Sequence, residues 1–535
     1  MTGPGVAQVR SWDPAALSQV AAEWEDAARR LVAEVDAALA DIEGGGHRWT
    51  GAAAEAAVAR ARRLAGRAEA AARILVTAAV AAADGAEQIA AARRHVLALV
   101  DVAHRDGLSV ADDGTVAPGP GAGPLLRMLA GGDPDAAADL LAARAARLSI
   151  EIADALRRVG MADADAAADI AAAFARASTA VSAAAATVPA GAWPVQAADI
   201  VDAWPAMSQD RIAAQIAAMT PQQREQLVAD FPHQVGNTDG VPWPMRIQAN
   251  RTNIAAAILA EDGRDQGSRR RVALYRELLG EVDDPAGRGP RAARQIVAFD
   301  PGRASLVELH GAVDSARGVA VLVPGVNTTM EGSAANAATA RRFVAGSRGT
   351  VAMLTYLGGP FPQVDDPVDV VREAADPGYA LQMAPRLVAF TEDVERVVPD
   401  GVTVTVIGHS YGGSIVGTAE TMGMTSDRTL FLAAAGAGVG VDDPSDWRNR
   451  NPHVQRFSMT APGDFIELAQ GVPGGPHGRD PDEMPGVTPL LTGRYDDGGW
   501  VAGWDAHSGM LNRPSDAWRT ILAVISGDPA GRGPA

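Results

Sequence analysis

The sequence predicts a mixed α/β protein: a mostly parallel β-sheet with helices on both faces, preceded by a largely α-helical N-terminal region. Two observations predict this organisation. Beyond residue 290, short apolar runs rich in β-branched residues alternate with helical stretches, which is typical of a parallel sheet covered on both faces. Before about residue 187, the chain is instead rich in alanine, the residue with the highest helix propensity.

The first predicted helix begins after Asp13, which is a suitable N-cap, with Pro14 in the first helical position. Apolar residues then recur at spacings of three, four and seven residues as far as Ile42, and glycines at 44–46 end the helix. A second helical stretch covers about 51–105. Two long helices with a tight connection predict an antiparallel hairpin.

The turn of this hairpin contains Trp49, Thr50 and Gly51. Here the chain resembles the W-x-G family of small helical-hairpin proteins that high-GC bacteria export by type VII secretion. The resemblance implies a helical-hairpin partner protein and export without a signal peptide. The alternative is that Trp49 only packs on the hairpin core. That family usually carries a Tyr-x-x-x-Asp/Glu signal just after the hairpin, whereas the first tyrosine here is Tyr275.

Composition excludes several classes of function. The formal net charge of −18 argues against nucleic acid and anionic membrane surfaces as partners. With no cysteines, the chain has no disulfides, thiolate metal sites or cysteine nucleophile. The N-terminus has no basic-then-apolar run, and the apolar stretches do not resemble a membrane span of ~20 residues. We therefore expect no transmembrane segment, and a protein that is cytoplasmic or exported without a signal peptide.

Changes in composition predict four segments. They are a helical hairpin at 1–110, a further helical region and linker at 111–190, a helical bracket or cap at 191–290, and the sheet-containing domain at 291–535. The expected strands of that domain are 296–299, 305–309, 319–323, 351–356, 402–407, 429–432 and 453–459. Helical stretches at 333–344, 379–398 and 414–425 separate several of them.

The strongest motif follows the predicted strand at 402–407. It reads G-H-S-Y-G-G over 408–413, and a helix containing small residues comes next. A strand, G-x-S-x-G and a helix together indicate a nucleophile elbow, in which a sharp turn exposes the serine hydroxyl. Gly408 and Gly412 leave room where a Cβ would clash. The motif therefore predicts an α/β-hydrolase fold with Ser410 as the nucleophile.

A serine nucleophile needs a histidine base and an acid that orients it, in the chain order Ser, acid, His. His507 lies shortly before the last predicted helix, where this fold places its base. His477 is the alternative. Asp464 follows the strand at 453–459 and is the expected acid, with 442–443, which reads Asp-Asp, as the alternative.

Two backbone N–H groups are expected to form the oxyanion hole. One is that of Tyr411, directly after the nucleophile. The other is that of Val326 or Asn327, in the loop after the strand at 319–323.

Several motifs together resemble an α/β-hydrolase family of uncharacterised function from high-GC actinobacteria. They are V-L-V-P-G-V at 321–326, the elbow at 408–413, P-G-D at 462–464, H-G-x-D-P at 477–481, and F-P-x-x-x-G-N-x-D-G-V-P at 231–242. The resemblance covers about residue 204 to the C-terminus and implies the triad Ser410, Asp464 and His507. The chain departs from the family at Y-L-G-G-P (356–360) and A-H-S-G (506–509), which affects the shape of the pocket more than the triad.

Other residues are expected to contact the substrate. The segment 204–251 precedes the sheet and either caps the site, with Arg246 steering an anionic substrate, or brackets a sheet edge. His409 and His477 are further candidates for substrate binding.

The sequence therefore predicts a serine esterase or lipase-like hydrolase that cleaves a small-molecule or lipid ester through an acyl-enzyme. This reaction needs no cofactor and no metal. The alternative is an exported interaction or effector protein in which the helical hairpin is the functional part and the hydrolase domain is vestigial.

Overall fold

The computed structural model describes residues 3–44, 51–119, 133–185, 197–287, 289–364, 375–468, 470 and 475–528. Contacts between Cα atoms divide the chain into two compact units. One is Met1–Ala190 with Ile258–Asp262, and the other is Gly191–Ala257 with Gly263–Ala535. Of the W-x-G turn, only Gly51 belongs to the described residues, so the interpretation of Trp49 lies outside them.

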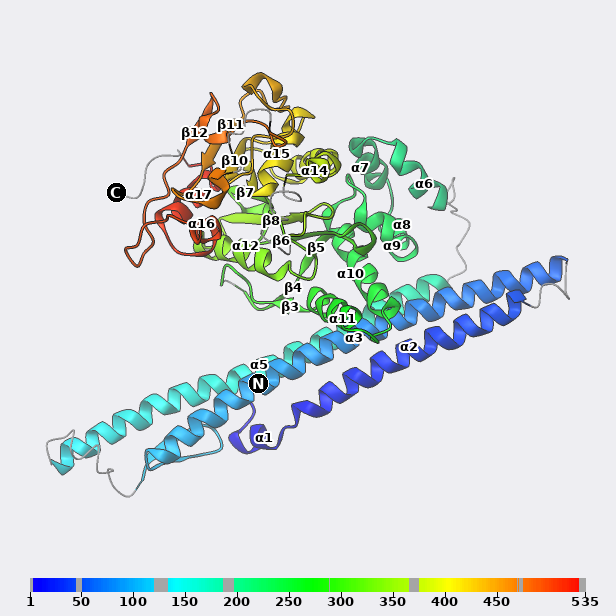
Figure 1. The fold of residues 1–535 in the computed structure, drawn as a ribbon. Coiled ribbons are helices and arrows are strands. Elements are labelled where there is room, and N and C mark those ends of the chain that lie inside the picture. The colour runs from blue at the N-terminus through cyan, green and yellow to red at the C-terminus, as the bar shows by residue number, and fades with distance from the viewer. Residues whose placement is uncertain are drawn as a thin grey trace. The chain divides into compact units, whose positions relative to one another are not determined.

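Three long helices dominate the N-terminal unit and lie side by side (Figure 1). Alanines buried along them let the helix axes approach closely. Val9 of the first short helix packs with Val96, Val100 and Leu148 of two long ones. The elements are α1 (Val6–Ser11), α2 (Pro14–Gly44), α3 (Ala52–Arg105), the paired strands β1 (Leu108–Val110) and β2 (Val116–Pro118), and α5 (Pro134–Ala185).

One helix among the described residues has the length and the apolar composition of a membrane span. It covers Val58–Arg105, most of α3, and 44% of its most apolar window is buried. α2 and α5 both pack along α3, and the central helix of a water-soluble bundle has the same properties. The expectation of no transmembrane segment therefore stays a prediction.

Helices precede the large sheet in the second unit. Their apolar core includes Trp204, Ile216 and Leu227, all buried. The elements are α6 (Ala197–Ala203), α7 (Gln209–Ala217), α8 (Pro221–Asp230), α9 (Pro232–Asn237), α10 (Trp243–Ala260) and α11 (Gln266–Leu279), followed by the short paired strands β3 (Glu281–Val282) and β4 (Ala292–Ala293).

An eight-stranded sheet forms the centre of this unit, in the order β12-β11-β10-β9-β7-β8-β6-β5. β6 runs antiparallel to both of its neighbours, and all other adjacent pairs are parallel. The strands are β5 (Gln295–Asp300), β6 (Ser305–His310), β7 (Gly318–Val323), β8 (Val351–Leu357), β9 (Thr403–His409), β10 (Arg428–Leu432), β11 (Gln455–Met459) and β12 (Val487–Pro489). The central strands are fully buried, as expected when helices cover both faces.

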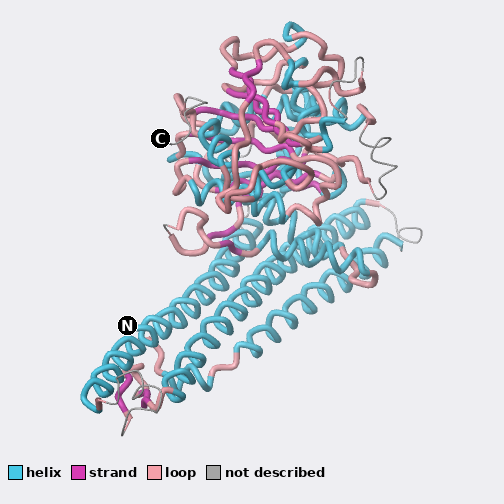
Figure 2. Tube along the Cα trace, turned by 60° about the vertical axis from the view of Figure 1, so that its left-hand side comes forward, coloured by secondary structure: helices cyan, strands magenta, loops and turns pink. Residues whose placement is uncertain are grey.

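Helices flank the sheet on both sides (Figure 2). Phe343 of α12 stacks on Trp518 of α17 at 4.8 Å between ring centroids, so these two helices share one face. α14 and α15 pack together on the other face (Figure 1). The helices are α12 (Ala334–Gly346), α14 (Gly378–Val397), α15 (Tyr411–Thr421), α16 (Ala506–Asn512) and α17 (Asp516–Ile525). The predicted fold class is confirmed, and the carboxyl ends of the parallel strands lie at one edge, where such folds place their sites.

Candidate active site

Ser410 occupies the turn between β9 and α15 in a strained backbone conformation. Its φ is 58° and its ψ is −125°, a region that L-residues rarely adopt. A Cβ added at Gly408 would lie 2.6 Å from Gly412 O, and one at Gly412 would lie 2.1 Å from Val323 O. Only glycine fits at either position, as the motif predicts, and the turn presents Ser410 at the carboxyl edge of the sheet.

His507 and Asp464 form a buried hydrogen-bonded pair. His507 Nδ1 lies 3.0 and 3.1 Å from the two carboxylate oxygens of Asp464. Because a carboxylate only accepts, Nδ1 carries the proton and Nε2 is left able to accept one. Asp464 Oδ1 also accepts from Ile466 N at 3.1 Å, which fixes the carboxylate. His507 lies in the first turn of the short helix α16, whereas the sequence predicted a loop.

His409 connects the nucleophile turn to the base. Its Nε2 lies 2.8 Å from the carbonyl oxygen of His507, and the two imidazole rings are 4.8 Å apart. No hydrogen bond joins Ser410 Oγ to His507 in the part of the chain that the structure describes. Catalytic contacts of this kind often tighten only in the complex with substrate.

Burial first, and the nearby His507 second, lower the pKa of His409 to about 4. The imidazole is therefore neutral near pH ~7, and its Nε2–H donates to the His507 carbonyl. This bond positions the backbone of the base. The Nε2 of His409 is thus engaged by the His507 carbonyl, and the predicted contact of His409 with substrate stays a prediction.

The low pKa of His409 makes stability depend on pH. Between pH ~6.5 and ~4 the unfolded chain protonates this histidine and the folded one does not, so stability is fully present above pH ~6.5 and falls below it. Lowering the pH from ~7 to ~5 therefore lowers the free energy of unfolding. We expect this decrease to be roughly 1–2 kcal/mol smaller in His409→Gln than in the unchanged protein. Urea unfolding followed by tryptophan fluorescence at both pH values measures this. An unchanged loss would contradict it.

Within the described part of the chain, only one of the two backbone N–H groups predicted as the second oxyanion donor is free of a partner. Asn327 N–H already donates to Pro362 O at 2.8 Å, so it is not available. Among the described residues, neither Val326 N nor Tyr411 N has a hydrogen-bond partner. A Cβ added at Gly325 would lie 2.6 Å from Ser410 Cβ and 2.9 Å from its Oγ. The loop before Val326 therefore packs directly against Ser410, and Val326 N–H remains the candidate donor.

His477 lies beneath the nucleophile turn and does not line a surface. Its side chain is buried, with Nδ1 2.9 Å from Ser414 Oγ, and its ring packs edge-on against Tyr411 at 5.2 Å. It contacts the first turns of α15, and its alternative role as base or in substrate contact stays a prediction.

The alternative acid at 442–443 does not reach a histidine in the described structure. Asp443 caps a short 3-10 helix, accepting from the backbone and hydroxyl of Ser445. These bonds lower the pKa of the exposed Asp443 carboxyl. Asp443 is therefore an exposed loop residue that caps its own turn.

Arg246 does not reach the site, so the prediction that it steers an anionic substrate was wrong. Its side chain is 2% exposed and pairs with Asp393 and Asp239, each at 2.8 Å. Its Nε also donates to Val297 O of β5 at 3.0 Å. Arg246 therefore ties α10 to the edge of the sheet and to α14. This is the bracket that the sequence offered as the alternative to a cap.

Replacing Arg246 by alanine is expected to lower the free energy of unfolding by about 3–5 kcal/mol, because Asp393 would keep a buried charge without its cation. Arg303→Ala is the control, since Arg303 is 67% exposed in its pair with Asp300 and such pairs contribute ~0–1 kcal/mol. Urea unfolding measures both. A loss at Arg246 no larger than at Arg303 would contradict the account.

Two aromatic residues beside the base were not predicted. The ring of Phe465 lies 4.3 Å from that of His507, and Trp504, 72% exposed, lies 5.6 Å from Phe465. Both flank triad candidates in sequence, at one residue after Asp464 and three before His507. Their closeness in sequence to Asp464 and His507 could have identified them as residues near the site.

Comparison with other proteins identifies the domain. Residues 300–472 match a family described as Alpha/beta hydrolase. The C-terminal half carries an α/β-hydrolase domain. The matched part of this α/β-hydrolase domain contains Ser410 and Asp464 and ends before His507.

Two curated relatives share part of the chain. These are the uncharacterized proteins MT2140 and Rv2079 from two strains of Mycobacterium tuberculosis, each 26% identical over 265 residues. The match covers 42% of this chain and 39% of each relative, so the chain spans about two fifths of their length. Among solved structures, TT1662 from Thermus thermophilus is 15% identical with a TM-score of 0.26, covering 43% of this chain and 99% of that one.

Proposed function

We propose that the α/β-hydrolase domain is a serine esterase that cleaves a small-molecule or lipid ester. The observation that carries the proposal is the Asp464–His507 pair, with His507 held by His409, the residue directly before the strained Ser410. A serine at this turn, a base with a protonated Nδ1 and a buried carboxylate are the parts that acyl transfer needs.

In the proposed reaction, His507 Nε2 takes the proton from Ser410 Oγ as the oxygen attacks the ester carbonyl. The N–H groups of Tyr411 and Val326 hold the resulting oxyanion. His507 then protonates the leaving alcohol and an acyl-enzyme forms. Water, deprotonated by the same nitrogen, releases the acid and restores the serine. Asp464 keeps Nδ1 protonated and stabilises the imidazolium throughout.

A chromogenic ester tests this proposal on the full chain. Mixing the protein with an excess of p-nitrophenyl acetate or butyrate in a stopped-flow instrument is expected to give a burst of p-nitrophenol proportional to the protein concentration, followed by slower turnover. The burst reports the acyl-enzyme. Folded protein that releases p-nitrophenol no faster than buffer, from any member of an ester panel, would contradict the proposal.

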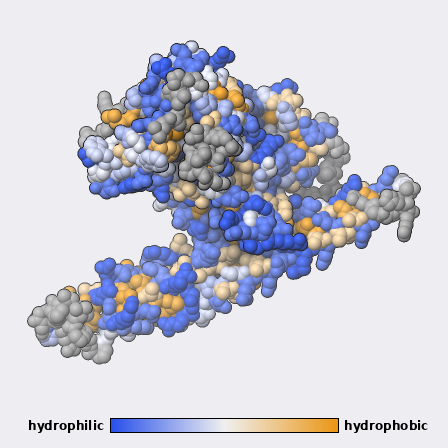
Figure 3. All heavy atoms as spheres, in the orientation of Figure 1, coloured by the Kyte–Doolittle hydropathy of each residue, from blue (hydrophilic) through white to orange (hydrophobic). Residues whose placement is uncertain are grey.

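A second candidate function concerns the helical unit. Large hydrophobic residues are exposed on α5, among them Ile150 at 72% and Met161 at 61%. Figure 3 shows hydrophobic residues interspersed with hydrophilic ones on the surface of the long helices. These residues support binding of a partner helix. Pull-down with chains carrying Ile150→Glu and Met161→Glu tests it, since unchanged recovery of partners would contradict it.

A further inference from the structure

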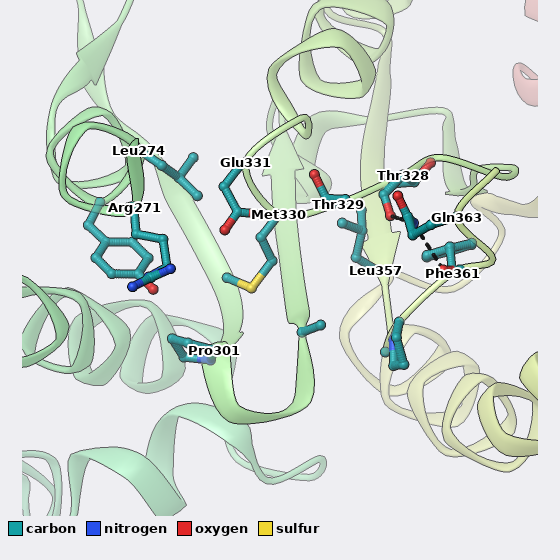
Figure 4. Close-up of a pocket in the computed structure, with 14 residues that line it drawn as sticks. Arg271, Leu274, Pro301, Thr328, Thr329, Met330, Glu331, Leu357, Phe361 and Gln363 are labelled. Carbon is teal, nitrogen blue, oxygen red and sulfur yellow. Dashed lines mark hydrogen bonds between the residues drawn. The ribbon is translucent and has the colours of Figure 1, made fainter. Parts of the chain in front are cut away.

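A groove of about 240 Å³ lies at the carboxyl edge of the sheet in the second unit. Its apolar lining comes from four elements: Leu274 and Tyr275 of α11, Leu357 at the end of β8, Met330 after β7, and Phe361. Figure 4 shows Met330 between Leu357 and Phe361 on one side and Arg271 and Pro301 on the other. Apolar side chains from α11, β8 and the segments after β7 and β8 therefore line this groove.

One end of the groove is built from the loop that supplies the proposed oxyanion donor. Thr328 lines the groove, and its Oγ1 donates to Gly325 O at 2.8 Å. Gly325 is the residue packed against Ser410. The wall at Thr328 thus belongs to the loop that packs against Ser410.

The segment that follows β8 is hydrogen-bonded to this loop. Gln363 Nε2 donates to Thr328 O at 3.1 Å, and Asn327 N–H donates to Pro362 O at 2.8 Å. Asn327 Oδ1 also accepts from Val364 N at 2.6 Å. These bonds satisfy the polar groups at this end, so the groove does not require a polar ligand there.

The rim of the groove carries one acidic and one basic side chain. Exposed Glu331 and half-buried Arg271 both line the groove, so its mouth carries one carboxylate and one guanidinium. A floor of leucine, methionine and aromatic side chains favours an uncharged, apolar group through removal of its surface from water. The lining therefore matches a hydrocarbon chain better than an anionic or sugar-like group.

The strand order separates the groove from the base. Ser410 follows β9, and the groove lies over β7, β8, β6 and β5 on one side of it. Asp464 follows β11, on the other side of β9, and its partner His507 lies beside His409 at the end of β9. Because the base must protonate the leaving alcohol, the alcohol belongs on the side of His507. The acyl part of an ester then extends toward the groove.

We infer that this groove binds the acyl chain of the substrate, and that it selects chains of short to medium length. The inference rests on the proposed esterase function. The volume of about 240 Å³ lies below the ~300–1,000 Å³ typical of pockets that enclose drug-sized ligands, so the groove encloses a chain of limited length. Longer chains extend past the rim into solvent and gain little further binding.

Two substitutions with opposite effects on the groove test the inference in the full chain. Leu274→Trp fills it from α11, and Met330→Ala widens its middle. The substrates are p-nitrophenyl acetate, butyrate, octanoate and palmitate. Leu491→Trp is the matched control, because Leu491 is 89% exposed and does not line the groove.

Leu274→Trp is expected to lower kcat/KM for octanoate at least about tenfold relative to acetate, the discrimination typical of a hydrophobic pocket. Met330→Ala is expected to shift the preferred chain toward greater length, and Leu491→Trp is expected to leave the profile unchanged. Labelling of Ser410 by a small dialkyl fluorophosphate is measured for each variant. Normal labelling with an unchanged chain-length profile in both groove variants would overturn the inference. No labelling of the wild-type chain would instead overturn the esterase function.

Discussion

Replacing Ser410 by alanine is expected to lower kcat for ester hydrolysis by about 10⁶-fold, as loss of the nucleophile does in other serine hydrolases. The physical reason is that the remaining oxyanion donors can still bind the carbonyl but no acyl-enzyme can form. Residual release of p-nitrophenol should show no burst. Stopped-flow absorbance with wild-type and Ser410→Ala protein at equal concentrations measures the difference.

The strained backbone of Ser410 provides the control for folding. Alanine keeps the strain at φ 58°, whereas Ser410→Gly relieves it and is expected to raise the free energy of unfolding by about 1 kcal/mol. Both variants should be equally inactive. A folded alanine variant that keeps a tenth or more of the activity would show that the nucleophile lies elsewhere.

The second large effect is expected at Asp464. Asp464→Asn should lower kcat by about 10⁴-fold, because an amide in place of the carboxylate allows the wrong tautomer of His507 and no longer stabilises its imidazolium. The loss should appear in kcat more than in KM, since the carboxylate is buried away from any substrate.

Asp443→Asn is the matched control for that substitution, because Asp443 is exposed and bonded only within its own loop. Steady-state kinetics on p-nitrophenyl butyrate compares the two. Near-normal activity of Asp464→Asn together with a large loss in Asp443→Asn would transfer the acid role to the alternative residue.

Much of the sheet could be predicted from the sequence. Seven of its strands were predicted, most of them from buried apolar runs, and the prediction places them within about two residues of their observed ends. β12 was missed, because Val487–Pro489 is a three-residue edge strand containing proline and has no apolar run to signal it. The strand predicted at 453–459 begins at Gln455, since 451–454 forms a turn.

Some roles in the candidate site could likewise be predicted from the sequence, and others could not. Ser410, Asp464 and His507 follow from local motifs and chain order, which are properties of the sequence itself. The fate of Arg246 depends on Asp393, which is distant in sequence, and on a backbone carbonyl of β5. Likewise, Asn327 loses its donor role only because Pro362 accepts from it. Tertiary partners decide such roles, and spacing along the chain does not encode them.

The central claim is that Ser410 is an activated nucleophile. Treating the full chain with a fluorophosphonate probe and mapping the modified peptide by mass spectrometry tests it most directly, with Ser410→Ala as the control. The account predicts a single modification on Ser410 that is absent in the variant and is slowed strongly by Asp464→Asn. Folded protein that stays unlabelled, or labelling at a different serine that persists in Ser410→Ala, would contradict it.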